Sequence, residues 1–189
     1  MTFSSTKQEV NKDYAKDIQE ALQNYTRVSS KDAKFLMSDL GECGQDPYMR
    51  ESPVKICVYL KLNRIWGWMP EPIDSTDVIQ AGVTWPEDFV RHWRNQENEQ
   101  FVWISCDALN SADRALIENL EYFPANRGIA LDFFPFSKTF SNASNLSSWI
   151  EEDVQMPPLV AVRITPSSSF PDNTPVVIEC RAYYKGESV

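Results

Sequence analysis

The stretch from Phe101 to Phe136 constrains the fold more than any other part of the sequence. It opens with one apolar segment, Phe101 to Cys106, and closes with another, Gly128 to Phe136. Both are rich in aromatic and β-branched residues, as strands are. The residues between them carry apolar side chains at the three- and four-residue steps of an amphipathic helix: Ala115, Leu116, Leu120 and Phe123. The stretch therefore predicts two strands that flank one helix.

Three further segments have the composition or alternation of strands. Residues 54–66 alternate in part between apolar and polar side chains, and residues 158–165 and 175–184 form two closing strands joined by a Ser- and Pro-rich turn. A helix is predicted from Pro86 to Trp93, because proline suits the first turn of a helix and two acidic residues follow it.

The N-terminal part of the chain is predicted to be helical and separable. Residues 7–25 have a helical apolar period, and a second short helix follows Ser30 and stops near Gly41. Residues 41–53 are polar and contain glycine and proline, as loops do. We therefore divide the chain into a helical leader or arm at residues 1–45 and a globular domain at residues 46–189.

Two architectures fit this order of elements. The preferred one is a single α+β domain with a mixed β-sheet flanked by helices, in which Phe101 to Phe136 forms a right-handed crossover. The alternative is a β-sandwich with helices inserted in its loops. In that case the last two strands resemble those that end jelly-roll proteins such as viral coats, a likeness that covers about thirty residues.

Charge and cysteine usage predict a compartment. The net charge of −9 argues against nucleic acid as the main partner, since binding phosphates needs clustered lysine and arginine. The four cysteines show no short paired spacing, and three of them lie in strand-like segments. We interpret them as buried thiols in a reducing compartment. The first residues lack the apolar run of a signal peptide, and no window is apolar enough to span a membrane. The sequence therefore predicts a soluble, cytoplasmic protein.

Candidate functional residues fall into two groups. Aromatic side chains could anchor a partner, and the candidates are Trp66, Trp68, Trp85 and Trp93. Asp107 and Asp132 could meet at strand ends as an acid/base pair. His92 is the only histidine, and the chain has neither a nucleophile motif nor a Gly-rich phosphate loop. No catalytic residue, metal site or cofactor is predicted.

Three functions remain open at this point. The leading hypothesis is a non-enzymatic interaction or assembly protein with an acidic, aromatic-rich surface. Its partner would be another protein, either a basic one or a second copy of this chain, and no membrane is involved. The first alternative is a small hydrolase or transferase that uses Asp107 and Asp132. The second is a coat-like viral subunit.

Overall fold

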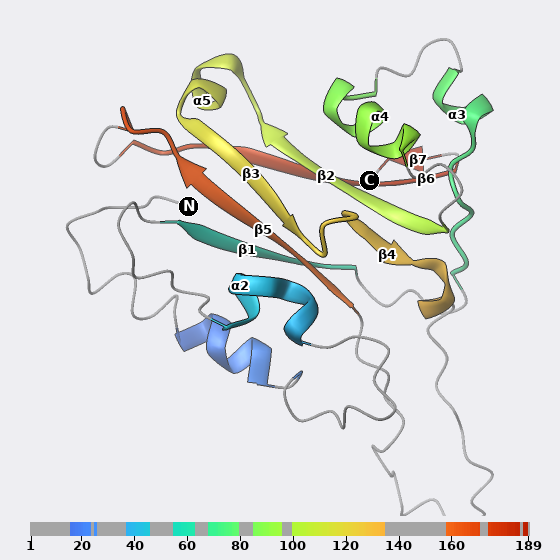
Figure 1. Ribbon diagram of the computed structural model, residues 1–189, viewed down its shortest axis with the longest axis horizontal. Helices are drawn as coiled ribbons and strands as arrows, with labels where there is room; N and C mark the ends of the chain where they lie inside the picture. The colour runs from blue at the N-terminus through green and yellow to red at the C-terminus, as the bar shows by residue number, and fades with distance from the viewer. Residues whose placement is uncertain are drawn as a thin grey trace, which may run out of the picture.

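The computed structural model describes two facing β-sheets and the helices that cover them (Figure 1). The described residues are 16–23, 25, 37–45, 55–62, 68–79, 85–95, 100–134, 158–170, 174–185 and 187–188.

The first sheet has three antiparallel strands in the order β1-β5-β3. They are β1 (Ile56–Lys61), β5 (Leu159–Pro166) and β3 (Ile117–Phe123). β5 is the central strand, and its side chains are buried along most of its length because both faces are covered, Val160 and Val162 by the core between the sheets and Leu159 and Ala161 by the cluster that includes α2. β1 and β3 are the two edges of this sheet.

The second sheet has four antiparallel strands in the order β4-β2-β6-β7. They are β4 (Gly128–Ala130), β2 (Phe101–Ala108), β6 (Ile178–Tyr184) and β7 (Glu187–Ser188). β2 pairs with β4 only at Phe101 to Trp103, whereas it pairs with β6 from Trp103 to Ala108.

The main core lies between the two sheets. Alternate residues of each strand point inward, as the pleat requires. The inward side chains include Val102 and Ile104 from β2, Tyr122 from β3, and Val160 and Val162 from β5. Each is at most 5% exposed.

Helices cover the outer faces of both sheets. Three helical segments pack on Cys57, Leu159 and Ala161 of the first sheet. They are residues 16–23, η1 (Met37–Leu40) and α2 (Gly41–Gln45). On the second sheet, α4 (Glu87–Arg94) packs on Trp103 and Tyr183, with α3 (Ser75–Ile79) nearby in the chain. The α+β prediction for a single domain is confirmed. The strands predicted at residues 158–165 and 175–184 match β5 and β6, and that at residues 54–66 matches β1 over Ile56–Lys61, with residues 54 and 63–66 outside the described residues.

The predicted crossover between Phe101 and Phe136 is wrong. The helix α5 is only Ser111–Ala115, and the chain then becomes β3, which belongs to the other sheet from β2. A register shift between Ile117 and Asn119 interrupts the strict alternation of β3. Beyond this shift the alternation is regular, so Leu120 faces the core between the sheets and Phe123, three positions later, faces the outer cluster beside α2. The apparent helical stripe thus combined residues from two faces of a strand.

The prediction of reduced cysteine thiols is also wrong. Cys43 is bonded to Cys57, which links α2 to β1. Cys106 is bonded to Cys180, its direct cross-strand partner, inside the core between the sheets. Sequence spacing could not reveal these pairs, because each bridge joins segments that only the fold brings together. Disulfides of this kind persist in oxidising compartments.

The buried phenol of Tyr122 closes one open side of the sandwich. Beyond Trp103, the edge of β2 has no strand beside it in the described part of the chain. The Cys106 N–H donates to Tyr122 Oη at 2.8 Å, and Tyr122 Oη donates to the Cys106 carbonyl at 3.1 Å. One hydroxyl therefore satisfies both backbone groups of Cys106, a residue that is 2% exposed.

Replacing Tyr122 by phenylalanine should lower the free energy of unfolding by about 1–3 kcal/mol, because it leaves two buried backbone groups unsatisfied. Urea unfolding measures this loss. Tyr59→Phe is the matched control, since its hydroxyl donates one bond, to the Cys43 carbonyl, from a half-buried position. A cost for Tyr122→Phe no larger than that for Tyr59→Phe would argue against the bridging role.

Candidate functional site

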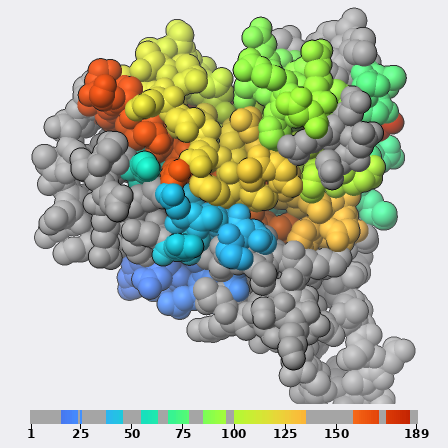
Figure 2. Space-filling model, viewed as in Figure 1, coloured from blue at the N-terminus to red at the C-terminus, as the bar shows by residue number. Residues whose placement is uncertain are grey.

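A polar cleft of about 520 Å³ lies between α4 and the region of α5 and β3. Figure 2 shows this hollow between the green atoms of α4 and the yellow-green atoms of α5. The charged and polar side chains that line it include Asp88, Arg91, Asp107, Arg114, Tyr122 and Arg127. α4, β2, α5 and β3 each contribute residues, and Arg127 comes from the connection between β3 and β4.

Two ion pairs line the cleft, one close and partly buried and one longer and exposed. Arg127 Nη1 lies 3.0 Å from Asp88 Oδ2, and its guanidinium stacks 4.1 Å from the centroid of the Tyr122 ring. Arg114 Nε lies 3.5 Å from Asp107 Oδ1, with both side chains more than half exposed. Burial raises the pKa of Tyr122, so the phenol stays neutral. Exposed ion pairs contribute little stability, so Arg114 can exchange partners at little cost, whereas Arg127 is only 20% exposed and is held in place.

The arginines of the cleft are suited to binding a partner. An arginine fork donates paired hydrogen bonds to a carboxylate or a carbonyl group of a partner. In the described ranges, no group of three or more His, Cys, Asp or Glu side chains is placed to hold a metal ion. The arginines were not singled out from the sequence, because they are scattered through it at positions 91, 114 and 127.

The two predicted carboxylates do not meet. Asp107 lies in the cleft at the end of β2, whereas Asp132 lies in η2 (Leu131–Phe133), beyond the opposite end of the same strand. Asp107 is six positions along the extended strand from Phe101, a span of roughly 20 Å. Both aspartates are exposed. An acid/base pair of these two residues therefore has no geometric support.

The tryptophan candidates lie in three different settings. Trp66 lies outside the described residues. Trp68 is half-buried and meets Phe134 and Tyr184 edge-on, with ring centroids 5.1 and 5.2 Å away. Trp85 and Trp93 belong to the aromatic cluster under α4, where Trp93 is only 3% exposed. Partner binding by these residues stays a prediction.

His92 lies on α4 as expected, but it is not a free surface residue. Its Nε2 is 3.1 Å from the Asn126 carbonyl oxygen, and its ring meets Trp103 edge-on at 5.9 Å. These contacts hold α4 against the β3–β4 connection and so fix one wall of the cleft.

An exposed ion pair ties the segment before α3 to the end of β6. The carboxylate of Asp74 accepts hydrogen bonds from the Thr76 side chain, from the Asp77 N–H at 3.1 Å and from Lys185 Nζ at 3.2 Å. These bonds, that of Thr76 above all, hold the pKa of Asp74 well below its ordinary value of 3.8. The same pairing raises the pKa of Lys185.

This lowered pKa makes a pH-dependent prediction. A carboxyl whose pKa is lower in the folded state stabilises the fold above its unfolded pKa, and that contribution is lost as the pH falls. Asp74→Asn should therefore be less stable than the parent at neutral pH, and the difference should shrink below pH 3.8. Urea midpoints at neutral pH and at about pH 2 test this. An equal deficit at both pH values would contradict it.

Within the described helices, none combines the length and the apolar character that crossing a bilayer requires.

Sequence comparison places this fold among known proteins. The chain matches the family model described as "Sodium / potassium ATPase beta chain" over residues 1–187. The sodium/potassium-transporting ATPase subunit beta-1 of Drosophila melanogaster is 30% identical over 132 residues, which are 68% of this chain and 35% of the relative. Subunit beta-2 of the same species is 29% identical over 142 residues, covering 72% and 37%. Subunit beta-233 of Anguilla anguilla is 27% identical over 161 residues, covering 84% and 45%. The chain thus spans less than half the length of these relatives.

These matches overturn the functional hypotheses drawn from the sequence. The hypothesis of a cytoplasmic interaction or assembly protein is wrong, because the matched model describes a chain of a transport ATPase. The hypotheses of a hydrolase or transferase and of a viral coat-like subunit are wrong for the same reason. The partner prediction, a second copy or a basic protein without a membrane, is wrong because the relatives are named as subunits of a transporter. The cytoplasmic localisation is wrong on the same ground, and the two disulfides agree with that correction.

Proposed function

Because this chain belongs to the sodium/potassium ATPase beta chain family, we propose that it is a non-catalytic subunit of a cation-transporting ATPase. Its partner is then the subunit that hydrolyses ATP. The observation that carries this proposal is the match of the family model to residues 1–187.

The chemistry of the chain supports a role that depends on contact with another subunit. ATP hydrolysis requires groups that hold the phosphates and a metal ion. The sequence contains six glycines in all and no Gly-rich phosphate loop. The cleft between α4 and α5 offers arginines for hydrogen bonding, so hydrolysis belongs to the partner and recognition to this chain.

The same proposal places the domain in an oxidising compartment, on the side of the membrane reached through the secretory pathway. The two disulfides support this placement. The division into a leader at residues 1–45 and a domain at residues 46–189 is kept as a proposal, with Cys43–Cys57 joining the end of the leader to β1.

Passage through the secretory pathway should leave a chemical mark. The sequence contains three acceptor sites for N-linked glycans, which begin at Asn24, Asn142 and Asn145. Chain secreted from insect cells should lose mass when treated with an N-glycosidase. The variant with all three asparagines changed to glutamine should not. If the parent chain shows no loss of mass, passage through that pathway would lose its support.

Capture of the partner tests the function itself. The full chain, tagged and preceded by an added signal sequence, is expressed in Drosophila cells depleted of their own beta-1 subunit. After solubilisation in detergent, the tag is captured and the material is probed for the ATP-hydrolysing subunit of the sodium/potassium-transporting ATPase. We expect the two chains to co-purify. A captured chain with both disulfides intact and no such partner would overturn the proposal.

The polar cleft is the surface that we propose for this contact, and one pair of variants separates it from the rest of α4. Arg91 lines the cleft, whereas Arg94 on the same helix does not, and both are exposed. Arg91→Glu should reduce co-purification several-fold, because it reverses a charge that faces the partner. Arg94→Glu should leave it unchanged. Equal effects of the two variants would argue against the cleft as the contact site.

A further inference from the structure

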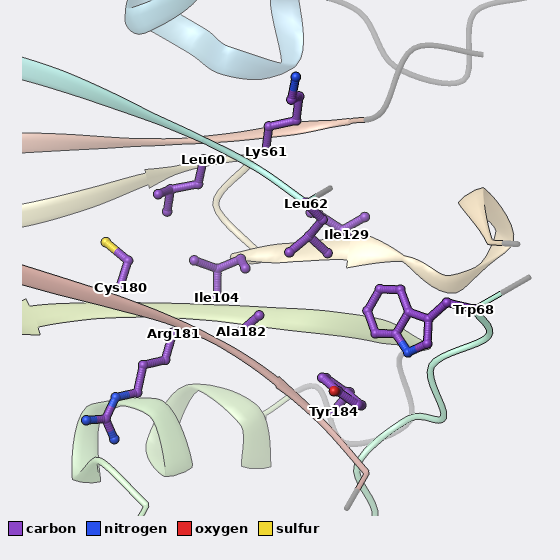
Figure 3. A pocket seen from close by; sticks show the side chains of 10 residues that line it. All are labelled: Leu60, Lys61, Leu62, Trp68, Ile104, Ile129, Cys180, Arg181, Ala182 and Tyr184. Carbon is purple, nitrogen blue, oxygen red and sulfur yellow. The ribbon is translucent and has the colours of Figure 1, made fainter. Parts of the chain in front are cut away.

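The fold contains a second hollow, of about 320 Å³, between β1 and β6. Its walls are mainly apolar, and Leu60 and Trp68 are among the side chains that Figure 3 shows around it. The charged ends of Lys61 and Arg181 leave this hollow in opposite directions, and Arg181 is paired with Glu179 at 2.8 Å. The hollow thus presents no pair of charges to one ligand, in contrast to the polar cleft.

In the polar cleft, Arg127 has a backbone conformation that is unfavourable for arginine. Its φ of 56° lies in the left-handed region, where a Cβ crowds the backbone and glycine or asparagine is preferred. Those two residue types flank it as Asn126 and Gly128, yet neither takes the left-handed position. Gly128 is required where it is, because a Cβ there would lie 2.7 Å from Cγ of Phe101. The turn therefore holds an arginine where glycine would relieve the backbone.

Contacts on both sides force this conformation of Arg127. Its N–H donates to the Pro124 carbonyl at 3.0 Å, and the Ile104 N–H donates to its carbonyl at 2.8 Å, so the turn is tied to β2. Its side chain stacks on the Tyr122 ring and pairs with Asp88. Strain of this kind persists where the surroundings over-determine a residue, and it is concentrated at functional sites. The strained position thus indicates a function for the arginine side chain.

One edge of the Arg127 guanidinium is left for a ligand. Only Nη1 is bonded to Asp88, and in the described part of the chain neither Nη2 nor Nε meets an acceptor. The side chain lines the cleft and is 20% exposed, so a group that enters the cleft can reach it. Arg163 shows that a guanidinium in this fold binds two carboxylates at once, since its Nη1 is paired with Glu42 and its Nη2 with Glu121. The planar fork of arginine suits this double pairing.

The carboxylates that line the cleft leave this edge of Arg127 open. Asp88 is held by Nη1, Asp107 faces Arg114 at 3.5 Å, and Glu87 makes no ion pair within the described residues. Stacking on Tyr122 already fixes the guanidinium, so little side-chain entropy is lost when a further carboxylate binds. The group that fits this edge is therefore a carboxylate supplied from outside the chain.

We propose that Arg127 recognises the partner by binding a carboxylate side chain of the ATP-hydrolysing subunit with the guanidinium edge that Asp88 leaves free. This inference rests on the proposed function and names the group that the partner places in the cleft. It gives Arg127 a role beyond holding α4, because the partner contacts the guanidinium itself.

Replacing Arg127 by glycine separates recognition from folding. Glycine relieves the left-handed backbone as it removes the guanidinium, so the urea midpoint should stay close to that of the parent. Capture of the ATP-hydrolysing subunit in Drosophila cells depleted of their own beta-1 subunit should fall at least tenfold, as expected for loss of a charged hydrogen bond. Equal capture by parent and Arg127→Gly would overturn the inference and leave the proposed function standing. No capture by the parent would overturn both.

A second variant, Asp88→Asn, distinguishes recognition from a merely structural role. It breaks the ion pair with Arg127 but keeps the guanidinium. If Arg127 binds the partner, its release from Asp88 should raise capture about threefold, the value of one half-exposed ion pair. If Arg127 acts only by holding α4 through Asp88, Asp88→Asn should lose capture as Arg127→Gly does, and that result would overturn the inference.

Salt dependence gives an independent readout of the same contact. Raising the salt concentration from about 0.05 to 0.5 M should reduce capture by the parent, because salt screens a contact between charges. Capture by Arg127→Gly should depend on salt less, and Arg127→Lys, which keeps the charge but not the fork, should lie between the two. The same salt dependence in parent and Arg127→Gly would contradict a carboxylate contact at this residue.

Discussion

The variant in which Cys106 and Cys180 are both alanine should lose about 4 kcal/mol of unfolding free energy, because its unfolded chain is no longer closed into a long loop. The bridge spans 74 residues and lies in the core between the sheets. The whole stability of a domain is only about 5–15 kcal/mol, so the loss should leave the domain close to its unfolding threshold. Urea unfolding of oxidised parent and variant under the same conditions measures the difference.

The second bridge is the matched control. Cys43 and Cys57 are 14 residues apart, so replacing both by alanine should cost about 3 kcal/mol on the same loop-length argument. The order of the two losses matters more than either value. If loss of the short bridge costs more than loss of the long one, closure of the unfolded chain is not the main source of stabilisation.

Changing Trp93 to alanine should lower the free energy of unfolding by about 3–5 kcal/mol, the usual cost of removing a large buried aromatic side chain. Trp93 lies on the buried face of α4 with Phe89 and packs in one cluster with Trp103 and Tyr183 of the second sheet, and it is 3% exposed. The measurement is again urea unfolding.

Arg94→Ala, on the next residue of α4, controls for general effects on the helix. Its side chain is exposed, so its cost should stay within about 0.5 kcal/mol. A residue that served only as a partner anchor would show the opposite profile, with weak effects on stability and strong effects on co-purification. If Trp93→Ala showed that profile, the conclusion that Trp93 stabilises the fold as a buried core residue would be contradicted.

The sequence predicted the strands better than their arrangement. β1, β5 and β6 show clear alternation or continuous apolar segments, and each was found close to its predicted bounds. β3 was mistaken for a helix because Leu120 and Phe123, three positions apart, fit a helical period although the strand places them on opposite faces of the sheet. Over so short a segment, local periodicity cannot distinguish one face of a helix from two faces of a strand.

The candidate site was the least predictable part. The cleft arises where α4, α5 and the β3–β4 connection meet, and none of these segments carries a recognisable binding motif. Arg91, Arg114 and Arg127 are brought together only by the pairing of β2 with its neighbours. The disulfides escaped prediction for the same reason, and the error about cysteine led directly to the wrong compartment.

The central claim is that this chain functions as one subunit of a transport ATPase. The most direct test is the native mass of the detergent-solubilised material after co-expression with the ATP-hydrolysing subunit of the Drosophila sodium/potassium-transporting ATPase. The account predicts a stable complex containing one copy of each chain. A chain that folds, forms both disulfides and still migrates apart from that subunit would contradict it.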